Sequence, residues 1–133
     1  MLDIIVITWI TSSFGNTLER EKIKMTTIAW FIFIAAAILE VAGDAIIRKG
    51  LHGNVMWFIA AGFLMLGGYG LVVNTVKWDF SRLLGVYVAV FAAVSILAGR
   101  FVFKETIPAS TWMGLAIIVI GGTVIQVGPG LGK

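Results

Sequence analysis

The chain contains no cysteine and a single histidine, His52. The absence of thiols excludes disulfides, thiolate metal sites and a cysteine nucleophile. One histidine in a predicted loop has no second ligand beside it, so His52 is interpreted as a solvated polar residue, and neither a metal nor a cofactor is expected. The sequence also lacks a nucleophile elbow, a zinc motif and a dinucleotide fingerprint, and an enzyme is therefore not expected.

Charged residues are scarce, and hydrophobic residues are abundant. Of the 133 residues, 13% are charged and 59% are hydrophobic, and the mean hydropathy is +1.02. Soluble domains carry about 25% charged residues, so this composition indicates a membrane protein. The net charge of +3 falls in short connectors, where it favours contact with anionic lipid headgroups and not with nucleic acid.

Four hydrophobic runs cover residues 26–47, 55–76, 83–103 and 111–127. Because a helix needs about 20 apolar residues to cross a bilayer, these runs predict an all-α integral membrane fold with four transmembrane helices. We expect residues 25–133 to form one multi-pass domain in the inner (plasma) membrane, with a polar turn at residues 51–54. Small residues at intervals of four in the third run, Gly85, Ala89 and Ala93, favour close helix packing.

Residues 1–24 do not match the rest of the chain. They consist of an apolar stretch too short to span a membrane and a polar stretch after it, without the features of a signal peptide. Met25 directly precedes the first full-length span. We therefore interpret residues 1–24 as an N-terminal extension that arises from a mis-assigned start site, and the alternative is a segment at the membrane surface.

The first span carries two carboxylates, Glu40 and Asp44. Placing a carboxylate in hydrocarbon costs at least about 2.5 kcal/mol, so such residues usually face a polar cavity or a partner. Residues four apart share a helix face, and Glu40, Asp44 and Arg48 are therefore expected to face one cavity. The spacing allows an ion pair between Asp44 and Arg48, which leaves Glu40 near the middle of the membrane as the unpaired acid.

An acid that binds either a proton or a cation meets the physical requirement of a proton-coupled cation carrier. The aromatic residues Tyr87 and Phe91, four apart in the third span, would add cation–π attraction for a cationic ligand. The candidate binding residues are thus Glu40, Asp44, Tyr87 and Phe91. The alternative is that the carboxylates only make structural hydrogen bonds between helices.

Basic residues do not favour one orientation in the membrane. From Met25 onward, three would lie on one side and four on the other, so the positive-inside rule selects no topology. Insertion in both directions would suit an antiparallel, dual-topology dimer. The two sets are Lys77, Arg82 and Lys133 against Arg48, Lys49, Arg100 and Lys104.

The motif LEVAG, in which Glu40 is followed by Gly43 and later by Arg48, resembles the first-helix signature of the small multidrug resistance transporters. Tyr87 falls where those proteins carry a tyrosine. Residues 103–122 are similar to the last-helix pattern of the wider drug/metabolite transporter superfamily, with Glu105 at a matching position.

This resemblance implies a proton-coupled antiporter that exports small organic cations of the guanidinium, polyamine or quaternary ammonium type. Glu40 would be the shared carboxylate for proton and substrate, and Tyr87 would line the site. Gly114 and Gly121, seven residues apart in the fourth span, would form the dimer contact, with a second copy or with a sibling subunit.

The chain departs from that family at Asp44, at Val90 where tryptophan is expected, and at Arg82 where proline is expected. Its third span is also short. Four-helix proteins of the YnfA type have a similar third span and are the second placement. The alternative function is accordingly a non-transporting membrane accessory or assembly subunit, whose carboxylates dock a partner helix.

Overall fold

The computed structural model describes the backbone of residues 2–131 and the side chains of residues 12, 13 and 15–128. Within that part the chain forms four helices and no strand: α1 (Leu2–Gly53), α2 (Met56–Val73), α3 (Phe80–Phe101) and α4 (Ala109–Leu131). Each helix contains a stretch long and apolar enough to cross a membrane. The predicted all-α fold with four transmembrane helices is confirmed, and the dimer stays a prediction.

The chain divides into two units, Met1–Phe31 and Ile32–Lys133. The first unit is helical throughout its described part and carries an ion pair between Lys24 and Glu21, with 3.7 Å between the charged atoms. The helix shows no break at Met25, and the interpretation of residues 1–24 as an extension stays a prediction. The apolar side chains of residues 1–10 lie outside the described ones. All candidate site residues belong to the second unit.

The first connector is shorter than predicted. Residues 51–53 continue α1, and His52 lies in the last turn of that helix, where its Nδ1 donates to the carbonyl oxygen of Arg48 at 2.8 Å. The prediction of a loop histidine was wrong because polar residues at the membrane surface keep the helical hydrogen bonds. The turn consists of Asn54, at φ 52°, and Val55, whose N–H donates to Gly50.

The second connector begins earlier than predicted. α2 ends at Val73 because two polar side chains bond its last carbonyl oxygens: Asn74 donates to Gly70 and Thr75 to Val72, each at 2.7 Å. These bonds compete with continuation of the helix and satisfy the carbonyl groups at its end. α3 then begins at Phe80, three residues before the predicted start.

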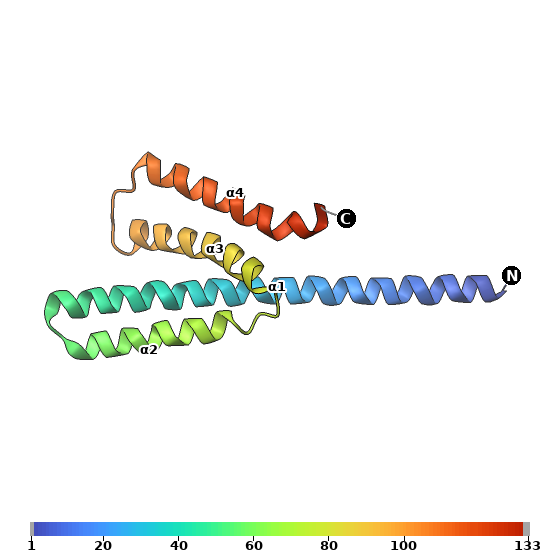
Figure 1. Ribbon diagram of the computed structural model, residues 1–133, viewed down its shortest axis with the longest axis horizontal. Helices are drawn as coiled ribbons and strands as arrows, with labels where there is room; N and C mark the ends of the chain where they lie inside the picture. The colour runs from blue at the N-terminus through green and yellow to red at the C-terminus, as the bar shows by residue number, and fades with distance from the viewer. Residues whose placement is uncertain (1, 132–133) are drawn as a thin grey trace. The chain divides into compact units, whose positions relative to one another are not determined.

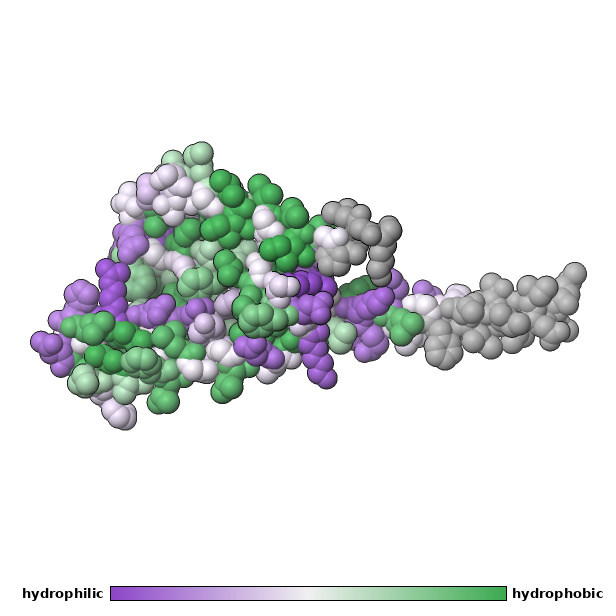
Figure 2. All heavy atoms as spheres, in the orientation of Figure 1, coloured by the Kyte–Doolittle hydropathy of each residue, from purple (hydrophilic) through white to green (hydrophobic). Residues whose placement is uncertain are grey.

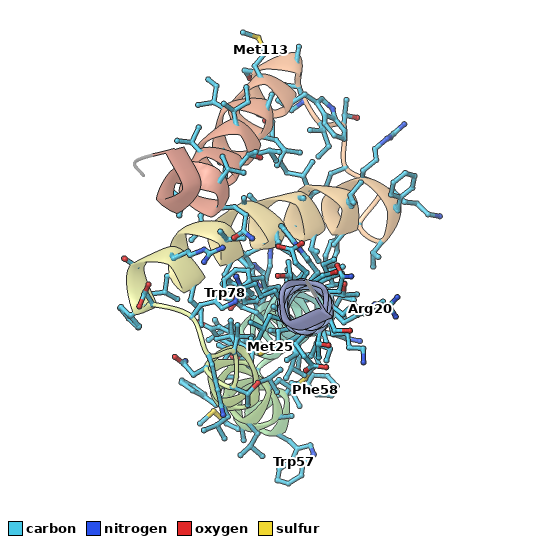
Figure 3. The ribbon with its side chains drawn as sticks, turned by 90° about the vertical axis from the view of Figure 1, so that its right-hand side faces the viewer. Arg20, Met25, Trp57, Phe58, Trp78 and Met113 are labelled. Atoms are coloured by element: carbon cyan, nitrogen blue, oxygen red, sulfur yellow. The ribbon has the colours of Figure 1, made fainter. Side chains whose placement is uncertain are left out.

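In the second unit, α1 lies between α2 and α3, and α4 packs on the other side of α3 (Figures 1 and 3). The backbones of α1 and α2 approach closely at Gly43 and Gly62, since a Cβ atom on Gly62 would lie 2.7 Å from the Gly43 carbonyl oxygen. The predicted small-residue stripe packs α3 against α4, where Ala89 faces Gly122. Small residues thus set both helix contacts.

The outer surfaces of the helices are apolar. Figure 2 shows hydrophobic side chains over much of α2 and α4, and hydrophilic ones near both ends of α2. Trp57 and Met113 point away from the other helices on opposite sides (Figure 3), and both are largely exposed. Such a surface is stable in lipid and not in water, which agrees with four membrane spans.

Two neighbouring glycines of α4 offer a test of the packing. A Cβ atom on Gly122 would lie 2.7 Å from the Cβ of Ala89, whereas one on Gly121 would meet nothing within 4 Å. Gly122→Ala is therefore expected to lower the free energy of unfolding by about 1–3 kcal/mol. Gly121→Ala should raise it by about 0.5–1 kcal/mol, because alanine favours the helix. Denaturant titration in detergent micelles, followed by circular dichroism, measures both, and effects of the same sign would contradict this packing.

Candidate functional site

The centre of the site is a hydrogen bond between two distant parts of the chain. The hydroxyl group of Tyr87 on α3 donates to Oε2 of Glu40 on α1, at 2.5 Å. The Tyr87 side chain is buried, and its ring packs on that of Phe33 of α1 in an edge-type arrangement, with 5.9 Å between the ring centroids. Packing of α1 on α3 therefore orients the tyrosine hydroxyl toward the carboxylate.

Glu40 and Tyr87 line a cavity of about 500 Å³ with side chains from α2 and α3. One of these, Tyr69 of α2, stacks its ring on that of Tyr87, with 6.1 Å between the centroids. Phe91 also lines the cavity, and its ring centroid lies 6.4 Å from that of Tyr87, as their spacing predicted. Sequence reasoning missed Tyr69, although a tyrosine among glycines in an apolar span is itself a polar signal.

Asp44 does not share this cavity. Asp44 and Arg48 line a separate cavity of about 210 Å³, and Phe91 is the residue common to the walls of both. The expectation that Glu40, Asp44 and Arg48 face one cavity was wrong. A residue four positions further along a helix is rotated about the axis by about 40° beyond a full circle. This rotation suffices to place Glu40 and Asp44 on opposite sides of the Phe91 ring.

The predicted ion pair between Asp44 and Arg48 is not formed. Among the residues whose side chains are described, charged atoms come within 4.0 Å of each other only in the pair of Lys24 and Glu21. Asp44 and Arg48 are both exposed. An exposed pair gains little Coulomb energy and loses side-chain freedom, so the spacing alone does not hold it together. Both charged groups remain available to the cavity that they line.

The glycines of the sequence motifs have packing positions. Gly43, three residues after Glu40, lies at the crossing of α1 and α2. Gly114 and Gly121, the predicted dimer contact, lie on α4, and a Cβ atom at either would meet no atom of another helix within 4 Å. Their role in a dimer stays a prediction.

Arg82 joins α3 to α4. Its Nε donates to Oε1 of Gln126 at 3.4 Å, and its NH2 group donates to the Gln126 carbonyl oxygen at 3.3 Å. The guanidinium also lies 4.6 Å from the ring centroid of Trp78. The sequence analysis named this residue as one of the basic residues and as a departure from the small multidrug resistance pattern, and assigned it no contact. In the described side chains, no group of three acidic, histidine or cysteine residues is arranged to hold a metal ion.

The chemistry available at this site is hydrogen bonding in a medium without bulk water. A carboxylate accepts about four hydrogen bonds, and Tyr87 occupies one of these positions on Glu40. In hydrocarbon, acceptor positions without a donor are costly. The site can therefore bind a group that donates hydrogen bonds to Glu40.

No protein-family model and no solved structure matches the chain. Several curated bacterial proteins do match, and each is called a UPF0060 membrane protein. One from Nocardia farcinica is 32% identical over 100 residues, which cover 74% of this chain and 90% of the relative. One from Streptomyces avermitilis is 34% identical over 103 residues, which cover 74% and 89%. A third, from Pseudomonas aeruginosa, is 29% identical over 108 residues, which cover 80% and 99%.

These relatives correct the functional expectation. Their names describe membrane proteins and assign no export of cations to any of them, and proton-coupled antiport of organic cations was therefore the wrong prediction. The YnfA-type placement, which the sequence analysis ranked second, is the one that the relatives support. By similarity over most of both lengths, the chain belongs to the family of UPF0060 membrane proteins.

Proposed function

We propose that this protein is a non-transporting subunit of an assembly in the bacterial inner membrane, and that its Glu40 cavity receives a polar side chain from a transmembrane helix of another membrane protein. The membrane-spanning helices support the location, as does the bacterial origin of the relatives. The proposal assigns no catalytic chemistry to the chain.

The observation that carries this proposal is the cavity at Glu40. Its walls include Glu40 from α1, Tyr69 from α2 and Tyr87 from α3. Among the last three helices, the backbones of α3 and α4 run close together, whereas those of α2 and α3 do not. The space between α2 and α3 thus leads to a carboxylate that has acceptor positions to fill.

A transmembrane helix is the occupant that suits such a space. Inside a bilayer, helices associate through close packing and interhelical hydrogen bonds, and a serine, threonine, asparagine or glutamine side chain supplies the donor. One such bond contributes about 1–2 kcal/mol in model helices. The apolar residues at the rim of the cavity, such as Val88 and Phe80, would pack against the same helix.

Photocrosslinking in intact membranes tests the proposal. A photoreactive amino acid at Val88, which lines the cavity and is 52% exposed, should give an adduct with a different membrane protein. The same amino acid at Leu64, which is 78% exposed on α2 and lies outside the cavity wall, is the matched control. The substitution Glu40→Leu should reduce the Val88 adduct about tenfold, as expected for the loss of a hydrogen bond to a charged group.

Mass spectrometry identifies the occupant of the cavity. An adduct with the mass of two copies would replace the proposed partner with a second copy of this chain. Equal adducts at Val88 and Leu64, or a Val88 adduct that Glu40→Leu leaves unchanged, would contradict a docking role for the carboxylate.

A further inference from the structure

A third cavity lies on α1 and α3, away from Glu40. It is a groove of about 610 Å³, and every residue that lines it is apolar. It shares no lining residue with the Glu40 cavity. Several residues of α1 and α3 line this groove and neither of the other two cavities: Ile38, Ala42, Ile46, Val94, Leu97 and Ala98.

The apolar groove is continuous with the small charged cavity at Asp44 and Arg48. Val41, Ala45 and Phe103 line both spaces. A ligand that occupied both would have a polar end beside the two charged residues and an apolar part in the groove. This is the shape of an amphiphile.

The order of groups along α1 specifies the amphiphile further. Arg48 lies nearest the end of the helix at Gly53, and Asp44 lies one turn deeper, about 6 Å along the axis. The groove begins beside these two residues, at Ile46 and Phe103, and continues deeper to Ala42 and Ile38. From the membrane surface inward, the protein thus presents a cation, an acceptor of hydrogen bonds and an apolar channel.

A single-chain phospholipid presents the complementary groups in the same order, namely a phosphate, a free glycerol hydroxyl and an acyl chain. We propose that the groove binds such a lysophospholipid from the surrounding bilayer. Its phosphate accepts hydrogen bonds from the Arg48 guanidinium, its hydroxyl donates to the Asp44 carboxylate, and its chain lies in the groove. Because the proposal uses a different cavity, it does not depend on the docking role of Glu40.

The two charged residues have separate effects on specificity. Arg48 selects for the phosphate, and two other basic residues at this end, Arg100 and Lys104, favour an anionic headgroup. Asp44 selects against two-chain lipids, since their second acyl chain occupies the backbone glycerol oxygen and leaves no hydroxyl between the phosphate and the chains. Such a lipid would place an ester oxygen beside a carboxylate without a donor between them.

Binding of radiolabelled palmitoyl lysophosphatidic acid to the purified full-length protein in a nonionic detergent tests this inference. The lipid should bind about tenfold more tightly than dipalmitoyl phosphatidic acid, which lacks the hydroxyl, and than monopalmitoylglycerol, which lacks the phosphate. These comparisons use the unaltered chain, so they decide the matter even where a variant fails to fold.

Variants locate the site. Arg48→Gln should weaken binding of lysophosphatidic acid about tenfold. Lys49→Gln, the neighbouring basic residue whose ammonium lies 5.4 Å from the ring centroid of Phe58 on α2, should change it by less than about twofold. Ala42→Phe should block the groove, whereas Ala60→Phe, at an exposed position of α2, should not.

Equal losses in Arg48→Gln and Lys49→Gln would show attraction to surface charge in general and would overturn the proposal. Equal binding of the three lipids, or unchanged binding in Ala42→Phe, would also overturn it.

Discussion

Gly62→Ala is expected to lower the free energy of unfolding by about 2–3 kcal/mol, the upper part of the range for an overpacked site. A Cβ atom at this position would lie 2.7 Å from the carbonyl oxygen of Gly43 and would also meet the side chain of Ile47. The backbone oxygen cannot rotate away as a side chain can, so α1 and α2 must move apart. Denaturant titration in detergent micelles measures the loss.

Gly67→Ala is the matched control on the same helix. Nothing lies within 4 Å of a Cβ atom at Gly67, so this change should stabilise the protein by about 0.5–1 kcal/mol. Similar losses in the two variants would mean that α2 does not approach α1 at Gly62. A larger residue at Gly67 should also be tolerated, because the surrounding space is open.

The second large effect is expected at the hydrogen bond between Glu40 and Tyr87. Tyr87→Phe removes the donor and leaves the carboxylate without it, and Glu40→Met leaves the buried hydroxyl without its acceptor. Each change should cost about 1–3 kcal/mol of stability. The double variant should cost clearly less than the sum, because replacing both partners by apolar groups leaves neither one unsatisfied.

The difference between the double variant and the sum of the single ones is the measurement, taken from unfolding in detergent. Asp44→Asn combined with Tyr87→Phe is the control, since Asp44 is exposed and lines a different cavity. Its effects should add within about 0.5 kcal/mol. Additive effects of Glu40→Met and Tyr87→Phe would contradict a direct bond between the two residues.

The spans were predictable from the sequence because a helix in lipid must be long and apolar. The helix ends were not, since hydropathy reports where the membrane surface lies and not where backbone hydrogen bonding stops. Residues 51–53 are mostly polar or small and still extend α1, whereas the apolar Val76 lies beyond the end of α2. At Asn74 and Thr75, side-chain hydrogen bonds decide the boundary.

The site was predictable in part. The cost of a carboxylate in hydrocarbon singled out Glu40, and family resemblance added Tyr87, which is 47 residues away and bonds to it directly. The spacing does not give the rotation of a side chain about the helix axis accurately enough to distinguish the two sides of the Phe91 ring. Asp44 was therefore assigned to the wrong cavity. Gly122, which no motif singled out, makes the contact with α3, and the dimer contact at Gly114 and Gly121 stays a prediction.

The functional prediction failed because the motif LEVAG is consistent with two roles, a transport site and helix packing. LEVAG was interpreted as a chemical signature that includes Gly43. In the structure, Gly43 has a packing role, because it allows α1 to approach α2 closely. Any four-helix protein with this crossing requires such an approach. The carboxylate in the motif indicates a polar site in the membrane and does not by itself identify transport.

Close packing at glycines divides the second unit into two helical hairpins, α1 with α2 and α3 with α4. Asn54 and Val55 alone join α1 to α2, while residues 74–79 join α2 to α3 and residues 102–108 join α3 to α4. Glycine contacts fasten each hairpin internally, and Glu40, Tyr69 and Tyr87 meet where one hairpin touches the other. We therefore expect a group that competes with Tyr87 for Glu40 to change the angle between the two hairpins more than the shape of either.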